Sequence, residues 1–482
     1  MLDPRPVLYV IGLLVASLGV TMLVPMAVDL WFATGHAAVF LQSAAVTILF
    51  GVFLALANKN GVREGLSLQQ TFLLTTSVWV VLPVFGAIPF VMGATGAGWT
   101  DAVFEAMSGM TTTGSTVFTG LQDLPEGLLA WRSILQWLGG VGIIVVAMVF
   151  LPELRVGGMQ IFRSEAFDTL GKILPRATEI ARQISVIYLA LTVACAFAYG
   201  AVGMDAFNAV MHALTTVSTG GFSTSDASFG AFAGGAEYVA VVFMLLAAMP
   251  FVRFVQLLAG SALPLWRDVQ IRAMLAVLGL AAVAIAIWLW AQAEAMTETA
   301  FRQSLFNATS ILTGTGYASA DYMLWGAFPI MVIFFLGLIG GCAGSTSCSV
   351  KIFRYQLLIA SIGAQVRRIY SPSGIFTPRY QGRAVGDDVM NSVMAFFVVF
   401  IAAIIILSVL LSATGLDAIT SVSGAVTALG NIGPGLGDQI GPAGHFGDLS
   451  GTAKWLLIAG MVLGRLELLA VLAIFTRKFW SV

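Results

Sequence analysis

Long apolar runs recur along the whole chain, and they are the feature that most limits what it can fold into. A run of about 20 apolar residues is long enough to cross the hydrocarbon core of a bilayer as an α-helix. The sequence has ten such runs, at residues 7–32, 38–57, 69–93, 128–151, 180–203, 236–263, 273–293, 325–350, 388–413 and 452–476. We therefore predict an all-α polytopic membrane protein with one span per run.

The charge content supports this prediction, because it is too low for a soluble protein. Only 10% of the 482 residues are charged, with 23 Lys and Arg and 24 Asp and Glu. A soluble domain carries about 25% charged residues. The first run, Val7 to Phe32, is longer than a signal-peptide core and has no small-residue cleavage site. We expect it to remain in the protein as a span.

Shorter semi-polar segments lie between some of the spans. They have about 12 residues, too few to cross a bilayer, and they are too apolar for ordinary loops. Each ends in a stretch rich in Gly, Thr and Ser, and the four segments lie at roughly 101–113, 205–219, 299–313 and 417–430. This predicts a unit of span, half-helix dipping into the membrane, irregular return and second span.

The irregular returns align with one another, which predicts an internal repeat. They read TTTGST at 111–116, VSTGGFS at 217–223, TGTGYAS at 313–319 and GNIGPG at 430–435, and we name them returns 1 to 4. The aligned glycines, Gly114, Gly221, Gly316 and Gly433, are separated by 107, 95 and 117 residues. We predict four pseudo-symmetric repeats around a central pore, preceded by two extra transmembrane helices. The predicted limits are 1–66 for the N-terminal pair and 67–152, 153–268, 269–384 and 385–482 for the repeats.

The basic residues predict the orientation of the chain. With the N-terminus in the cytoplasm, 18 of the 23 Lys and Arg fall on cytoplasmic loops, as the positive-inside rule requires. Three fall outside, at Arg132, Arg302 and Lys454, and two within spans, at Arg253 and Arg465. Acidic residues lean toward the outer face, where they would raise the local cation concentration. The plainer interpretation is that short loops need polar residues.

Four non-helical returns at one depth predict a path for cations. Backbone inside a membrane must be hydrogen-bonded, buried in protein or in contact with water. Four returns around one axis could direct their carbonyls inward and replace the hydration shell of a cation. The glycines permit the backbone angles this requires, and the half-helices would direct partially negative C-terminal ends to the axis. The alternative is that these glycines only pack helices closely.

The sequences around the returns resemble a known family. The segments are FEAMSGMTTTGST at 104–116, MHALTTVSTGGFST at 211–224, FNATSILTGTGYAS at 306–319 and ALGNIGPGLG at 428–437. The chain resembles the membrane subunit of the Trk/Ktr/HKT superfamily of potassium transporters, and most closely its Trk-type branch. The resemblance covers about residue 69 to the C-terminus as four repeats. The fourth repeat departs furthest, with Pro434 after its glycine.

The resemblance implies a selectivity filter for K⁺, the transported ion, without an organic cofactor in this chain. The carbonyls it implies belong to Thr112, Thr113, Gly114, Ser218, Thr219, Gly220, Gly221, Gly314, Thr315, Gly316, Asn431, Ile432 and Gly433. Because Pro434 follows the last of these glycines, the four-fold symmetry of such a filter would be imperfect.

Two further features suggest a gate. The stretch 339–349, IGGCAGSTSCS, is rich enough in small residues to break its helix, although a tight helix crossing is an alternative. The resemblance implies an obstructing intramembrane loop at Gly340, Gly341, Cys342, Ala343, Gly344, Ser345, Thr346 and Ser347. Arg465, with Glu467 nearby, lies in the last span, where a charge costs at least about 2.5–3.5 kcal/mol. The resemblance implies that Arg465 is an electrostatic barrier; alternatively it satisfies carbonyls at a broken helix. For Arg253 we expect snorkelling toward the cytoplasm.

The predicted partners follow largely from the resemblance. It implies a homodimer and a cytosolic, nucleotide-binding, TrkA-like regulatory subunit. The basic segments 152–182 and 354–383 could serve as docking surfaces or as anchors to anionic membrane lipid. We predict no nucleic-acid partner, and a location in the cytoplasmic (inner) membrane.

The predicted function is potassium uptake through a channel-like pore that a regulatory partner controls. The alternative is a cation-coupled secondary transporter of another solute. Arg465 and Glu467 are the only candidates for its substrate site, and they are weak ones. We predict no enzyme, because no catalytic triad, metal cluster or P-loop occurs. The cysteines Cys195, Cys342 and Cys348 have no paired spacing, and the histidines His36, His212 and His445 indicate no site.

Overall fold

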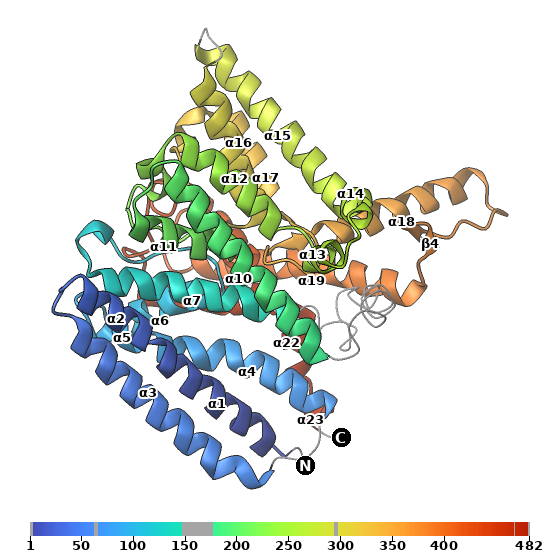
Figure 1. The fold of residues 1–482 in the computed structure, drawn as a ribbon. Helices are drawn as coiled ribbons and strands as arrows, with labels where there is room; N and C mark the ends of the chain where they lie inside the picture. Colours follow the sequence, from blue (N-terminus) through green and yellow to red (C-terminus); the bar gives the residue numbers. More distant parts are fainter. Residues whose placement is uncertain (1–2, 62–65, 147–176, 294–296, 467, 481–482) are drawn as a thin grey trace.

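The computed structural model describes residues 3–61, 66–146, 177–293, 297–466 and 468–480. Two packed helices open the chain and lie along one edge of the molecule beside α4 (Figure 1). They are α1 (Arg5–Thr21), continued by α2 (Leu23–Trp31), and α3 (Ala37–Asn58), followed by η1 (Lys59–Gly61). A Cβ on Gly12 would lie 2.6 Å from the backbone nitrogen of Ala55, so glycine permits this close crossing.

Four units of similar order follow this pair. Unit 1 contains α4 (Leu68–Gly86), α5 (Ile88–Met92), α6 (Trp99–Met110), η2 (Leu121–Asp123) and α7 (Glu126–Val145). Unit 2 contains α10 (Ala177–Ala201), α11 (Ala206–Val217), η4 (Ser228–Phe232), α12 (Gly235–Ala247), α13 (Phe251–Leu258) and α14 (Leu263–Arg267). Unit 3 contains α15 (Val269–Ala293), α16 (Glu298–Thr313), η5 (Tyr322–Trp325), α17 (Ala327–Gly337), β1 (Ile339–Gly340), β2 (Val350–Lys351), α18 (Ile352–Tyr370), β3 (Arg379–Tyr380) and β4 (Arg383–Ala384). Unit 4 contains α19 (Asp387–Ser412), α20 (Ala418–Gly430), α21 (Gly451–Arg465), α22 (Leu468–Ile474) and α23 (Arg477–Trp480).

The four predicted half-helices are α6, α11, α16 and α20. Three of them begin at a side-chain N-cap: Asp205 caps α11, Thr297 caps α16 and Asp417 caps α20. Hydrogen bonds from Thr420 hold the pKa of the Asp417 carboxyl below its usual range. The second span of each unit packs against the half-helix of the next unit, in the pairs α7–α11, α12–α16, α17–α20 and α21–α6. Because the last pair returns to unit 1, the units close into a ring.

The prediction of an all-α membrane protein is confirmed, but the described residues do not contain all ten predicted spans as single helices. Within the described residues, seven helices are long and apolar enough to cross a membrane, and two bent pairs could each make one more. The predicted span 236–263 is α12 and α13, which meet at an angle of 89°. Pro250 precedes α13 and lacks the N–H that would continue α12. The predicted span 325–350 is reduced to α17, 11 residues long, which ends near the predicted break.

The structure overturns the expectation for Arg253 and gives the surroundings of the other charged residues. Arg253 does not snorkel, because its Nε donates to Asp268 at 2.7 Å and its side chain is only 10% exposed. Arg132, Arg302 and Lys454 belong to helices α7, α16 and α21, and each is in an ion pair. The predicted docking segment 354–383 is mostly α18 with the β3–β4 hairpin, which projects from the molecule (Figure 1). Its Arg354 is buried, and most of the other segment, 152–182, lies outside the described residues.

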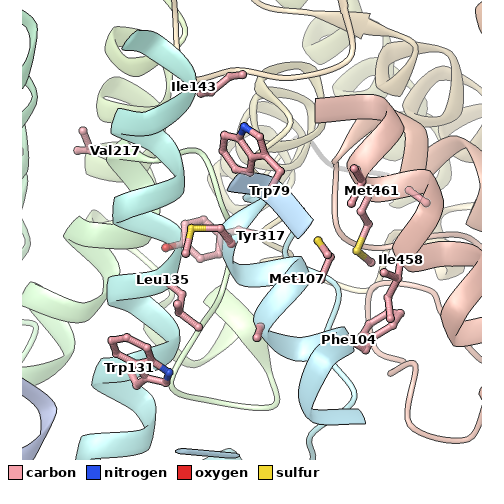
Figure 2. Close-up of a cluster of buried hydrophobic side chains, with 14 of the residues drawn as sticks. Trp79, Phe104, Met107, Trp131, Leu135, Ile143, Val217, Tyr317, Ile458 and Met461 are labelled. Atoms are coloured by element: carbon pink, nitrogen blue, oxygen red, sulfur yellow. The ribbon is translucent and has the colours of Figure 1, made fainter. Parts of the chain in front are cut away.

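The core between the units consists of large apolar side chains. Figure 2 shows Trp131 and Leu135 of α7, Phe104 and Met107 of α6 and Met461 of α21, which belong to a single buried cluster. Trp131 is also fixed by its indole N–H, which donates to the carbonyl of Gly86 at 2.8 Å. This packing fixes the half-helix α6 between α7 and α21.

A buried aspartate joins the N-terminal helices to unit 1. The carboxylate of Asp29 is 1% exposed and accepts hydrogen bonds from the backbone N–H of Gly127 at 2.9 Å and from Thr34. His36 lies 3.3 Å from the same carboxylate, a role that the sequence did not indicate. This contact fixes α2 against the beginning of α7.

Replacing Asp29 tests that contact. The Asp29→Ala change leaves the buried N–H of Gly127 unpaired, which costs about 1–3 kcal/mol. We expect a lower melting temperature of the purified protein in detergent. Asp448→Ala is the control, because the Asp448 side chain is 81% exposed. Equal melting temperatures for the two variants would contradict a structural role for Asp29.

Candidate functional site

The four returns share an unusual backbone conformation. Each has two residues with positive φ, two positions apart, and every pair ends at the aligned glycine. The pairs are Thr112 (53°) and Gly114 (87°), Thr219 (51°) and Gly221 (78°), Gly314 (73°) and Gly316 (82°), and Asn431 (50°) and Gly433 (106°). Positive φ at every second residue turns successive peptide planes so that their carbonyls can face one side. The alignment of the returns in the sequence therefore corresponds to a shared geometry.

The N–H groups of the returns are bonded back to the half-helices. In each return the residue before the aligned glycine donates to a carbonyl five positions earlier, in the last turns of the half-helix. The pairs are Thr113 to Ser108 (2.8 Å), Gly220 to Thr215 (2.9 Å), Thr315 to Ser310 (2.8 Å) and Ile432 to Thr427 (3.1 Å). These N–H groups are thus hydrogen-bonded to the half-helix that precedes the return.

The returns meet in a closed ring. At each aligned glycine, an added Cβ would come very close to the carbonyl oxygen that precedes the aligned glycine of a neighbouring return. From the added Cβ to the carbonyl oxygen, the distances are 2.3 Å for Gly114 and Gly220, 1.9 Å for Gly221 and Thr315, 1.9 Å for Gly316 and Ile432, and 3.0 Å for Gly433 and Thr113. The order of contacts is 1–2–3–4–1, so the four returns surround one axis. A side chain at any of these positions would collide with the neighbouring backbone.

The predicted site residues of the returns all lie in or beside this ring. Except for the half-buried Gly114 and Gly316, all thirteen are buried. On one side, the four aligned glycines line a cavity of about 300 Å³, which we call the vestibule. Arg132, Asp226 and His445 also line the vestibule.

Hydroxyl and amide side chains support the returns from behind. In return 1 the hydroxyls of Thr111 and Thr113 are 2.7 Å apart, and in return 3 those of Thr313 and Thr315 are 2.8 Å apart. Return 4, which departs most in sequence, is tied to return 1. The amide of Asn431 donates to the Thr113 hydroxyl at 2.9 Å. Asn431 therefore fixes the position of return 4 through its side chain as well as its backbone.

The sequence did not reveal the group behind returns 1 and 2. Arg132 of α7 and Glu105 of α6 form an ion pair at 2.8 Å, and their side chains are almost completely buried. Glu105 accepts from the hydroxyl of Thr116 and from the N–H of Val117, both at 2.9 Å. Gln136, one turn after Arg132, donates to the carbonyl of Gly220 at 2.5 Å. The i, i+4 spacing of Arg132 and Gln136 is the signal that could have identified a shared helix face.

The predicted loop of small residues contacts the ring at Thr112 and Gly314, which are not among the residues that line the vestibule. We define it as residues 338–351, between α17 and α18. Its ends are joined by the parallel pair β1–β2, which aligns Ile339 with Val350. The Sγ of Cys348 is 3.7 Å from the hydroxyl of Thr112, and a Cβ on Gly314 would lie 3.5 Å from the Cys348 nitrogen. The loop thus contacts returns 1 and 3 directly.

The loop is held by the break in unit 2. The N–H of Cys342 donates to the carbonyl of Ala248 at 3.0 Å, and the N–H of Phe251 donates to the carbonyl of Gly344 at 2.9 Å. The N–H of Ala343 donates to the side chain of Gln270 at 2.9 Å. The predicted gate residues Gly340, Gly341, Ser345, Thr346 and Ser347 are buried in the same loop.

The structure brings Arg465 to this loop. Arg465 is 3% exposed and ends α21. Its guanidinium donates to the Sγ of Cys348 and, at 3.0 Å, to the carbonyl of Gly139. Its Nε has no hydrogen-bond partner within the described part of the chain. Glu467, its sequence neighbour, lies outside the described residues.

The fold and the site together define a class: an integral membrane protein in which four units surround one axis and meet in a ring of glycine-containing returns. Residues 36–481 match the TrkH family, described as "Cation transport protein". The chain belongs to this family.

Similar proteins cover nearly the whole chain. The "Trk system potassium uptake protein TrkI" of Halomonas elongata is 42% identical over 98% of this chain and 96% of its own length. The "Trk system potassium uptake protein TrkH" of Escherichia coli K12 is 35% identical over 99% of each chain. The crystal structure of the potassium transporter TrkH from Vibrio parahaemolyticus matches with a TM-score of 0.91 at 34% identity, covering 100% of both chains.

The contacts of the ring can be tested without any assumption about function. An alanine at Gly221 would place a Cβ 1.9 Å from the Thr315 carbonyl, at a φ of 78°. Overpacking of this kind costs about 1–3 kcal/mol. We expect Gly221→Ala to lower the melting temperature in detergent. Gly279→Ala in α15 is the control, since no atom lies within 4 Å of its added Cβ. A melting temperature equal to that of the control would contradict the close approach of returns 2 and 3.

Proposed function

We propose that this protein carries potassium ions into the cell across the cytoplasmic (inner) membrane, through the ring of returns. The single observation that supports this most is the closed ring with positive φ at every second residue. Carbonyls that face one axis can replace the hydration shell of a dehydrated cation. The names of the relatives, which are potassium uptake proteins, support K⁺ as the ion. The proposal includes a cytoplasmic N-terminus.

In this proposal, the thirteen backbone positions predicted from the sequence form the K⁺ filter. No return contains Lys, Arg, Asp or Glu, so coordination would rest on carbonyl dipoles. The half-helices α6, α11, α16 and α20 end at the returns, and their partially negative ends favour a cation there. A transporter coupled to another solute would need free charged groups at mid-depth. The buried carboxylates Glu105 and Asp268 are instead paired with arginines, which favours the ion pathway.

We further propose that the loop 338–351 and Arg465 form the gate. The loop lies directly against returns 1 and 3, and Arg465 adds a positive charge beside it. A cation that leaves the ring on this side would meet both. A TrkA-like cytosolic subunit that binds a nucleotide would control this gate, and two copies of the chain would form a dimer. The projecting α18 and β3–β4 hairpin are the candidate docking surface for that subunit.

Uptake of ⁸⁶Rb⁺ into proteoliposomes that contain only this chain tests the proposed function. We expect unlabelled K⁺ to block the uptake far better than Na⁺ does. Equal competition by the two ions would contradict a K⁺-selective path. If no uptake occurs, the same assay with Arg465→Ala distinguishes a closed pore from a wrong function, because opening the gate should then produce flux.

Replacing a glycine of the ring tests the filter. In Gly316→Ser the added Cβ would lie 1.9 Å from the carbonyl of Ile432 and would displace it. We expect the preference for K⁺ over Na⁺ to fall by about tenfold, or 1.4 kcal/mol. The competition assay measures this ratio. Gly279→Ser, on a helix face with open space, should keep the preference of the original chain. An unchanged preference in Gly316→Ser would exclude Gly316 from the filter.

Removing the charge at the loop tests the gate. Arg465→Ala takes away the buried guanidinium that contacts Cys348 and Gly139. We expect basal ⁸⁶Rb⁺ uptake without any partner to rise, because the electrostatic barrier and one anchor of the loop are lost. Arg477→Ala, in the exposed first position of α23, should leave basal uptake unchanged. Unchanged or lower uptake in Arg465→Ala would refute the barrier.

A further inference from the structure

Side chains on one face of α7 form hydrogen bonds with three backbone groups of return 2. The amide nitrogen of Gln136 donates to the carbonyl of Gly220 at 2.5 Å, and its amide oxygen accepts from the N–H of Phe222 at 3.0 Å. These two groups flank Gly221, the aligned glycine of the return. Arg132, one turn earlier on α7, donates to the carbonyl of Ser223 at 2.7 Å. Both side chains are almost completely buried.

We propose that Gln136 and Arg132 are positioning residues that set the geometry of return 2, and thereby the preference of the ring for K⁺ over Na⁺. This inference rests on the proposed function. The aligned glycines permit the close approach of the returns and the positive φ of their backbone. The orientation of the Gly220 carbonyl, which lies against Gly114 of the neighbouring return, depends on what holds it from behind.

The packing leaves Gln136 little freedom. A Cβ on Gly220 would lie 2.4 Å from the Cδ of Gln136, so the amide lies directly on the backbone of the return. The guanidinium of Arg132 lies over the ring of Phe222, 4.2 Å from its centre. A carbonyl and an N–H held on both sides of one residue cannot rotate without breaking a buried hydrogen bond, which is unfavourable.

Arg132 also links this support to return 1. It is held by the ion pair with Glu105, and its Nη2 donates to the hydroxyl of Thr116 at 3.2 Å. Glu105 in turn accepts from the N–H of Val117. The buried ion pair of Arg132 and Glu105 therefore holds the C-terminal ends of returns 1 and 2 in register.

Returns 3 and 4 obtain support of a different kind. The hydroxyl of Ser310, on the half-helix before return 3, donates to the carbonyl of Tyr317 at 2.8 Å. Thr427, on the half-helix before return 4, donates to the carbonyl of Gly433 at 3.0 Å. Return 2 instead receives Gln136 and Arg132 from the second span of the preceding unit. A change in α7 should therefore alter one side of the ring while the half-helices remain in place.

Loss of the hydrogen bond to the Gly220 carbonyl should allow this carbonyl to move within the ring. A cation smaller than K⁺ is coordinated well only if carbonyls move inward, and a hydrogen bond from behind opposes that movement. Loss of the Gln136 amide would free the carbonyl to follow Na⁺. The expected result is a lower preference for K⁺, with the path itself intact.

The test is the ⁸⁶Rb⁺ competition assay with Gln136→Met, which keeps the length of the side chain and removes both hydrogen bonds. We expect the K⁺ over Na⁺ preference to fall by about tenfold, the effect of one buried hydrogen bond. Misfolded protein carries no flux, so a merely structural role would lower the rate and leave the ratio unchanged. If Gln136→Met does not fold, Gln136→Glu decides, because it keeps the shape and the acceptor for Phe222 but cannot donate to Gly220.

Trp137→Phe is the matched control. It removes a hydrogen bond from the next residue of α7, from the indole N–H to the Thr192 hydroxyl at 3.0 Å. This bond faces α10 rather than the returns, so the preference for K⁺ should not change. A preference within twofold of the original in the folded Gln136 variant would overturn the inference. Failure of the original chain to prefer K⁺ would instead refute the proposed function, so the two failures are distinguishable.

Discussion

Backbone that leaves the helical conformation inside a membrane must find partners for its polar groups, and the structure of the ring depends on this requirement. In all four returns the N–H before the aligned glycine is bonded to the last turns of the preceding half-helix. The alternation of positive φ then directs carbonyls away from that helix. A single return could not satisfy these carbonyls, whereas four returns around one axis place them where a dehydrated cation can. The closed order of the units follows from the same need.

Ion pairs between second spans and half-helices are the second organising feature. Glu105 pairs with Arg132 beside returns 1 and 2, Glu237 with Arg302 between α12 and α16, and Asp101 with Lys454 between α6 and α21. Each pair joins the second span of a unit to a half-helix. Burying a charge is costly unless it is paired and hydrogen-bonded. A wrong register between a span and a half-helix would leave such a charge unpaired, so the pairs favour the correct packing of spans against half-helices.

Much of this architecture could be predicted from local sequence signals. The half-helices were located to within a few residues because each is a short semi-polar segment that ends in a glycine-rich return. The bend at Pro250 was missed because the apolar run continues across it and hydropathy is insensitive to a missing N–H. The count of basic residues placed Arg132 on the outer side and indicated no partner for it. Its partner Glu105 is 27 positions away, and only the fold brings the two together.

The breaks in units 2 and 3 complement each other. Pro250 leaves carbonyls at the end of α12 without the N–H groups that a continuous helix would supply. The non-helical loop 338–351 supplies these N–H groups. The N–H of Cys342 donates to the carbonyl of Ala248, and the N–H of Thr346 donates to the carbonyl of Ala247. Neither break would be stable alone in a membrane. Any movement of the loop away from the ring must therefore break its hydrogen bonds to Ala247, Ala248 and Phe251, unless the end of α12 and the start of α13 move with it. The opening of the proposed gate is thus coupled to the helix that carries Arg253 and its ion pair with Asp268.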